Sequence, residues 1–190
     1  MPFYVHAQDQ PDVADQLAEL CEEHWSYMDR FDSRLILRGP TLSDDGEEHT
    51  GSVHVVDLAD RADAERFATE EPFWKAGLYR DYTAVAAEVL LCREPAVDVP
   101  HTLVTARWPL RARASGDVEQ HGLPGAESDG RLVFVAVLVD DEGTGMTGVV
   151  AAVRALPDEA QGLVQPFADR LAAGRPAPLT AQHWQRGGRN

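Results

Sequence analysis

The sequence predicts an α+β protein in which one small β-α-β-β-α-β unit occurs twice in tandem. The main observation is an internal sequence repeat, because residues 41–79 and residues 138–174 contain nearly the same features in the same order. In each copy a strand enters an Asp-Asp turn, a Thr-Gly strand follows, and a helix closes on Pro-Phe. A period of roughly a hundred residues is too long for a solenoid and indicates a duplicated domain.

The first copy contains four expected strands and two expected helices. The strands, rich in aromatic and β-branched residues between turn signals, are expected at residues 3–8, 34–38, 52–57 and 82–92. An apolar stripe at helical spacing predicts a helix over residues 13–31, and a second helix is expected from about residue 61 to Pro72. This order of elements is the ferredoxin-like arrangement.

The second copy keeps the strands and the last helix but departs from the first copy near its beginning. Strands are expected at residues 102–108, 131–139, 146–154 and 178–184, with a helix at 158–173. Residues 112–130 lack an apolar helical stripe, so the first helix of this copy is expected to be shortened or replaced by a loop.

These patterns divide the chain into a first domain, a linker, a second domain and a tail. The first domain is expected at residues 1–94 and is followed by a proline-containing linker at 95–100. A degenerate second copy is expected at 101–186, and a disordered tail at 187–190. Each ferredoxin-like unit leaves one sheet face bare. The two sheets are therefore expected to pair face to face, either within the chain as a pseudo-dimer or between the chains of a homodimer.

Bulk composition limits the partners. The net charge of −15 argues against nucleic acid and anionic membranes. Cys21 and Cys92 are the only cysteines and are expected to be reduced thiols. No signal-peptide pattern and no apolar run of membrane-spanning length is found in the sequence. We therefore expect a cytoplasmic protein whose partner is a small molecule.

Five separated motifs make the first copy resemble the YciI-like (YCII-related) family over about residues 3–90. They are Ala7-Gln8-Asp9, Glu22-Glu23-His24, Arg34-Leu35 to Gly39-Pro40, Thr50-Gly51-Ser52, and Pro72-Phe73 with Ala76-Gly77-Leu78-Tyr79. The resemblance implies a dimeric α/β-barrel fold and, from some members, a cofactor-independent lyase such as a dehydrochlorinase. It maps the family's paired His and Asp onto His24 and Asp9. Two departures are Glu71, where the family usually has Asp, and a missing Lys-Pro-Phe ending.

The spacing of the reactive residues agrees with a shared site. Alternation along the first strand puts Phe3, Val5, Ala7 and Asp9 on one face, and His24 projects from the apolar stripe of the first helix. A carboxylate beside an imidazole can fix its tautomer and make it a better base. The alternative is a buried histidine whose carboxylate partner is purely structural.

Other side chains are weaker candidates. Substrate-binding or proton-donating roles are assigned to Tyr27, Arg38, Ser52, Glu71, Trp74 and Tyr79. An exposed arginine without a ligand is the alternative for Arg38, and core or interface packing is the alternative for Trp74 and Tyr79. His49 and His54 lie near acidic residues, but their spacing is not that of a zinc site. No phosphate loop or dinucleotide fingerprint is present, so we expect neither a metal nor a cofactor. In the second copy Trp108 replaces Asp9, and His121 has no strand-end carboxylate, which indicates a scaffold.

The hypothesis from sequence is a cofactor-independent acid–base enzyme that acts on a small cyclic or aromatic substrate. Its reaction would be that of an isomerase, cyclase, dehydratase or eliminating lyase, with His24 as base and Asp9 orienting it. One alternative is a non-catalytic ligand-binding or assembly module. Another, a cofactor-free monooxygenase, rests on fold analogy alone.

Overall fold

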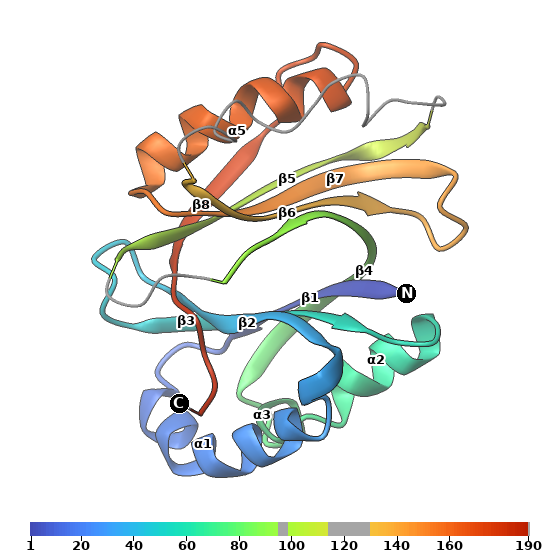
Figure 1. Cartoon of the computed structure of the whole chain (residues 1–190). Helices are drawn as coiled ribbons and strands as arrows, with labels where there is room; N and C mark the ends of the chain where they lie inside the picture. Colours follow the sequence, from blue (N-terminus) through green and yellow to red (C-terminus); the bar gives the residue numbers. More distant parts are fainter. Residues whose placement is uncertain (95–98, 114–129, 190) are drawn as a thin grey trace. The chain divides into compact units, whose positions relative to one another are not determined.

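The computed structural model describes residues 1–94, 99–113 and 130–189 (Figure 1). The chain divides into two compact units. Unit 1 comprises Met1–Val85 together with Arg186–Asn190, and unit 2 comprises Ala86–Gln185. The boundary therefore falls inside a long strand, β4 (Tyr79–Cys92), rather than in the proline-containing segment after it.

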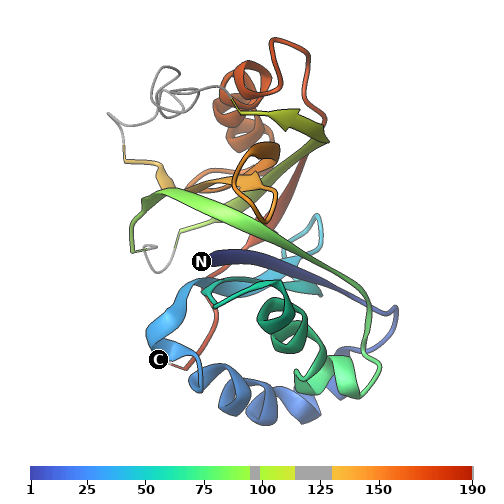
Figure 2. The ribbon, with the colours of Figure 1, turned by 90° about the vertical axis from the view of Figure 1, so that its right-hand side faces the viewer.

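Unit 1 is an antiparallel sheet covered by helices. Its elements are β1 (Pro2–Asp9), α1 (Ala14–Asp29), the short 3-10 turn Asp32–Arg34, β2 (Leu35–Leu42), β3 (His49–Asp57), α2 (Arg61–Thr69), α3 (Pro72–Lys75) and the first part of β4. β3 lies between β1 and β2 and is antiparallel to both. The three helices lie on one side of these strands (Figure 2). The reactive residues predicted from the first copy therefore belong to one layered unit.

Pro72 begins a helix rather than ending one. α2 ends at Thr69, and the Glu71 side chain then caps α3 by accepting a hydrogen bond from the Trp74 backbone nitrogen at 3.0 Å. Proline is well tolerated at the first position of a helix, where its missing N–H has no intrahelical partner to lose. The equivalent Pro166 lies inside α5 (Pro157–Leu171). The Pro-Phe motif that marks the repeat thus has a different structural position in each copy.

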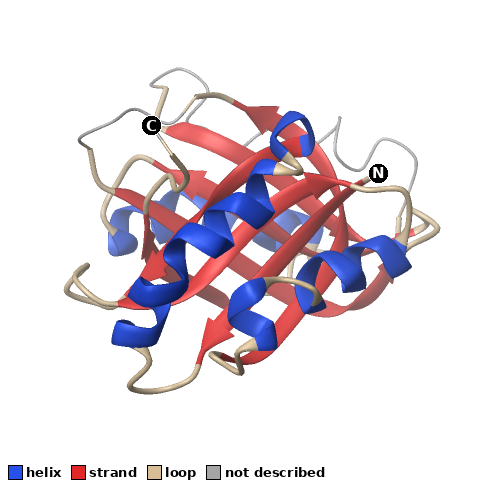
Figure 3. Cartoon of the chain, turned by 90° about the horizontal axis from the view of Figure 1, so that it is seen from below, coloured by secondary structure: helices blue, strands red, loops and turns tan. Residues whose placement is uncertain are grey.

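Unit 2 is a second antiparallel sheet with one described helix, α5. Its strands are the end of β4, β5 (His101–Ala112), β6 (Leu132–Val139), β7 (Gly145–Val153) and β8 (Leu179–Trp184). β7 pairs with β5 and β6, β5 also pairs with β8, and β6 pairs with the end of β4. Figure 3 distinguishes the helices, in blue, from the strands that they cover. Most of the predicted loop over 112–130 lies outside the described residues.

The last described residues return to unit 1. The Gly187 backbone N–H donates to the carbonyl oxygen of Arg38 at 3.0 Å. The Arg189 guanidinium donates to Asp29 at 2.7 Å and to Ser26 at 3.0 Å, and also pairs with Glu22. The tail expected to be disordered is therefore held against β2 and α1 as far as Arg189. Sequence alone did not indicate this, because the partners are more than a hundred residues away.

Gly51 is required where β1 and β3 approach each other. A Cβ atom at this position would lie 2.3 Å from the carbonyl oxygen of Ala7. We expect Gly51→Ala to lower the free energy of unfolding by about 1–3 kcal/mol, because the strands must separate. Gly162→Ala in α5 is the control, since nothing described lies within 4 Å of its added methyl group. It should raise stability by up to about 1 kcal/mol. Urea unfolding checks both values, and equal effects would contradict the close approach.

Candidate active site

The candidate site occupies the helix-covered face of the unit 1 sheet. Phe3, Val5, Ala7 and Asp9 are all buried, but Tyr4 is buried too, so burial alone does not distinguish the two faces of β1. Ala7 lies opposite Ser52 and Val5 lies opposite His54, and cross-strand partners share a face. Ala7 packs in a cluster with Leu17 of α1, which identifies this face as the one beneath the helices.

His24 is paired with Glu71. Its Nδ1 lies 2.5 Å from Oε1 of Glu71, and both side chains are buried. Because a carboxylate only accepts, Nδ1 carries the proton and Nε2 is the nitrogen that can exchange one. The His24 ring also stacks on Phe73 with a centroid distance of 4.4 Å and an interplanar angle of 3°. Glu71 and Phe73 thus fix the ring from two sides.

The expected pairing of His24 with Asp9 is therefore wrong. The cap of α3 explains the difference. Glu71 uses Oε2 to accept from the Trp74 backbone, which leaves Oε1 for the imidazole. Asp9 instead uses Oδ2 to accept from Nδ1 of His49 at 2.6 Å. The unit thus contains two His–carboxylate pairs where the sequence predicted one.

Tyr79 and Ser52 form a buried hydrogen bond on the same face. The Tyr79 hydroxyl donates to Oγ of Ser52 at 2.8 Å, and the Tyr79 ring lies edge-on to Phe73 with centroids 5.7 Å apart. Burial, reinforced by the negative charges of Glu71 and Asp9, raises the pKa of Tyr79 well above its usual value. Tyr79 therefore stays protonated and acts as a hydrogen-bond donor.

His54 of β3 adjoins His24, and Arg38 lies beside His54 on β2. The centroids of the His54 and His24 rings are 5.9 Å apart, and Arg38 lies opposite His54 in the β2–β3 register. Burial lowers the pKa of His54 well below its usual value, and the nearby His24 and Arg38 lower it further. His54 is thus a neutral side chain. The Arg38 guanidinium lies 3.5 Å from Asp32, and its side chain is 18% exposed.

Two predicted ligand-binding residues have structural contacts. The Tyr27 hydroxyl donates to the carbonyl oxygen of Phe67 at 3.1 Å, and burial raises the pKa of Tyr27 to about 12. Trp74 is half-buried, packs against the cluster around Ala7, and lies edge-on to Tyr82 with centroids 4.9 Å apart. These contacts make Tyr27 a poor proton donor and Trp74 a packing residue.

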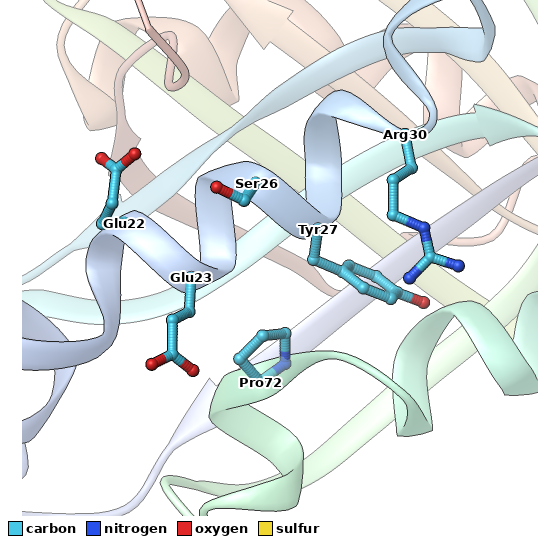
Figure 4. A pocket seen from close by; sticks show the side chains of 6 residues that line it. All are labelled: Glu22, Glu23, Ser26, Tyr27, Arg30 and Pro72. Carbon is cyan, nitrogen blue, oxygen red and sulfur yellow. The ribbon is translucent and has the colours of Figure 1, made fainter.

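A surface groove of about 380 Å³ lies beside α1 and the start of α3 (Figure 4). Its lining residues are Glu22, Glu23, Ser26, Tyr27, Arg30 and Pro72. Glu23 and Pro72 are the chain neighbours of His24 and Glu71, but His24 and Glu71 are not among the residues that line the groove. Of these lining residues, only Tyr27 was among the site residues predicted from the sequence.

Within the described ranges, no group of three or more His, Cys, Asp or Glu side chains is arranged to hold a metal ion. Over the same residues, no helix has the length and apolar character needed to cross a membrane. Trp108, at the position corresponding to Asp9, is half-buried on β5, whereas His121 lies outside the described residues.

Solved structures similar to the whole chain have the same fold class. A candidate monooxygenase from Lactobacillus acidophilus NCFM is 9% identical, with 97% of this chain and 93% of that chain covered and a TM-score of 0.56. An anthrone oxidase-like protein is 11% identical, with 98% and 90% covered and a TM-score of 0.54. These likenesses confirm the predicted α+β fold of the dimeric α/β-barrel class.

A family model matches the first part of the chain. Residues 1–87 match the model of the YCII-related domain, as the motifs of the first copy predicted. It is also similar to 5-chloro-2-hydroxyhydroquinone dehydrochlorinase (TftG) from Burkholderia phenoliruptrix AC1100, at 23% identity and a TM-score of 0.42. That match covers 45% of this chain and 92% of the other. The comparison with curated proteins gave no match.

Proposed function

We propose that the protein is a cofactor-independent acid–base enzyme for a small cyclic or aromatic substrate, with His24 as the base and Glu71 as its orienting carboxylate. The observation that carries the proposal is the buried 2.5 Å contact between Nδ1 of His24 and Oε1 of Glu71. This contact fixes the tautomer and leaves Nε2 for the substrate. Glu71 thus takes the orienting role that the sequence assigned to Asp9.

The reaction begins with proton removal beside a carbonyl group. Nε2 of His24 takes a proton from the carbon, and the electron pair of the broken C–H bond moves onto the carbonyl oxygen to give an enolate. Glu71 stabilises the imidazolium, while Arg38 stabilises the enolate. Return of the proton to another atom completes an isomerisation. Expulsion of a leaving group from the adjacent carbon completes an elimination. The neighbouring rings of Phe73 and Tyr79 suit a planar substrate.

A second candidate, a non-catalytic binding module, is favoured by one observation. The His24 side chain is only 11% exposed, as expected for a histidine whose role is to satisfy a buried carboxylate. The two candidates differ in a measurable way, because a binding module holds a ligand without exchanging its protons.

Deuterium exchange tests the proposal directly. The protein is incubated in D2O with α-hydroxycyclohexanone, cyclohexenone and chlorohydroquinone, and NMR follows deuterium incorporation and chloride-loss products. We expect exchange or elimination with at least one compound. His24→Gln should slow it at least about a hundredfold, because the base is gone. His183→Gln on β8 is the matched control and should leave the rate unchanged. Binding without any exchange would instead support the binding module.

A further inference from the structure

His49 reaches the site because β3 carries a bulge. Thr41 of β2 lies opposite Gly51, whereas the following Leu42 lies opposite His49, so Thr50 is an extra residue in β3. Simple alternation from Ser52 would place His49 on the other face of the sheet. The extra residue returns it to the face of Ser52, where its Nδ1 meets Asp9. Bulges commonly re-aim a side chain next to a functional site.

Asp9 has one oxygen in use and one without a donor. Oδ2 accepts from His49, but the buried Oδ1 has no hydrogen-bond partner among the described residues. The Asp9 side chain is only 6% exposed. A buried carboxylate oxygen without a donor is costly, and an added donor recovers that cost. Oδ1 is therefore set up to accept a hydrogen bond from a bound molecule.

The two His–carboxylate pairs belong to one face and are linked by buried side chains. Asp9 lies two residues along β1 from Ala7, which is opposite Ser52. Ser52 accepts from Tyr79, Tyr79 contacts Phe73, and the ring of Phe73 stacks on His24. To use both pairs, a ring-sized molecule would have to meet Nε2 of His24 at one edge and present another edge toward Asp9.

We propose that Asp9 binds a hydroxyl group of the substrate through Oδ1, with His49 as the positioning residue that holds the carboxylate. The inference rests on the proposed function for the chemistry at His24 and adds a substrate class: a small ring that carries a phenolic or enolic hydroxyl group. A substrate carboxylate at this point is disfavoured, because its charge would repel Asp9. A methyl ether is also disfavoured, because it has no proton to donate.

Equilibrium binding of hydroquinone and its dimethyl ether tests the site without requiring turnover. We expect the wild-type protein to bind hydroquinone about tenfold more tightly, as befits a hydrogen bond to a charged acceptor. Asp9→Asn should reduce the preference to within about twofold, because only one amide atom accepts and His49 occupies it. Asp81→Asn, an exposed carboxylate on β4, is the control and should keep the preference. NMR titration gives the dissociation constants.

A second variant covers the case in which Asp9→Asn does not fold. His49→Gln keeps the carboxylate but loses its ring donor, so hydroquinone binding should weaken severalfold while binding of the dimethyl ether is unchanged. Equal wild-type affinity for the two probes, or a preference that survives in both variants, overturns the proposal. Deuterium exchange is measured separately. If the protein shows no deuterium exchange but still prefers hydroquinone, the proposed enzymatic activity is wrong and the proposed hydroxyl-binding site stands.

Discussion

Glu71→Gln is expected to slow deuterium exchange at least about a hundredfold and to lower the free energy of unfolding by about 1–3 kcal/mol. The carboxylate accepts from two donors, Nδ1 of His24 and the Trp74 backbone nitrogen. An amide has only one accepting oxygen, so either the imidazole or the cap of α3 loses its partner. Loss at the imidazole removes the tautomer control on which Nε2 depends. Loss at the cap loosens α3, which carries Phe73.

Two further variants separate these effects. Glu71→Asp keeps a carboxylate that suits a helix cap but shortens its reach, so exchange should fall to a value between those of wild type and Glu71→Gln. Asp60→Asn changes the capping carboxylate of α2, which accepts from the Asp63 backbone nitrogen and has no histidine partner in the part of the chain described. It should leave exchange unchanged. Wild-type exchange in Glu71→Gln would show that His24 needs no carboxylate and would refute its assignment as an oriented base.

Local periodicity predicted the elements and faces of the fold well. The strand expected at 3–8 is β1 at Pro2–Asp9, and the helix expected at 13–31 is α1 at Ala14–Asp29. The period of two in β1 and the apolar stripe of α1 predicted that Asp9 and His24 are buried, and both side chains are buried. These features depend on neighbouring residues alone, so a sequence shows them directly.

The partners within the site depend on contacts that periodicity does not describe. Glu71 is 47 positions from His24 along the chain, and it reaches the imidazole only because Pro72 starts a new helix. His49 meets Asp9 only because Thr50 is an extra residue in its strand. Each depends on one local irregularity, a helix start or a bulge, that switches which way a side chain points. Local periodicity therefore predicted that Asp9 and His24 are buried, but not which partner each of them meets.

The free energy of unfolding is expected to fall as the pH is lowered from about 6.5 to about 4. Burial lowers the pKa of His6 to about 4 and lowers the pKa of His54 well below its usual value. The Tyr4 hydroxyl lies 3.2 Å from Nδ1 of His6 and can donate to the neutral ring. In this pH range the unfolded chain binds protons at both residues while the folded protein binds fewer. Stability therefore rises with pH, by up to about 1.4 kcal/mol per pH unit for each group.

His54→Leu isolates one of these two contributions. Leucine cannot be protonated, so the slope of unfolding free energy against pH should become shallower by up to about 1.4 kcal/mol per unit below pH 6.5. His183→Leu on β8 controls for the loss of a histidine. Urea unfolding at several pH values gives the slopes, and comparing slopes cancels any constant packing difference. Carboxylates also titrate in this range, but equally in both variants.

An unchanged slope in His54→Leu would mean that His54 is protonated in the folded protein. It would then carry a positive charge on a ring whose centroid is 5.9 Å from that of His24, which would oppose the imidazolium of the proposed mechanism.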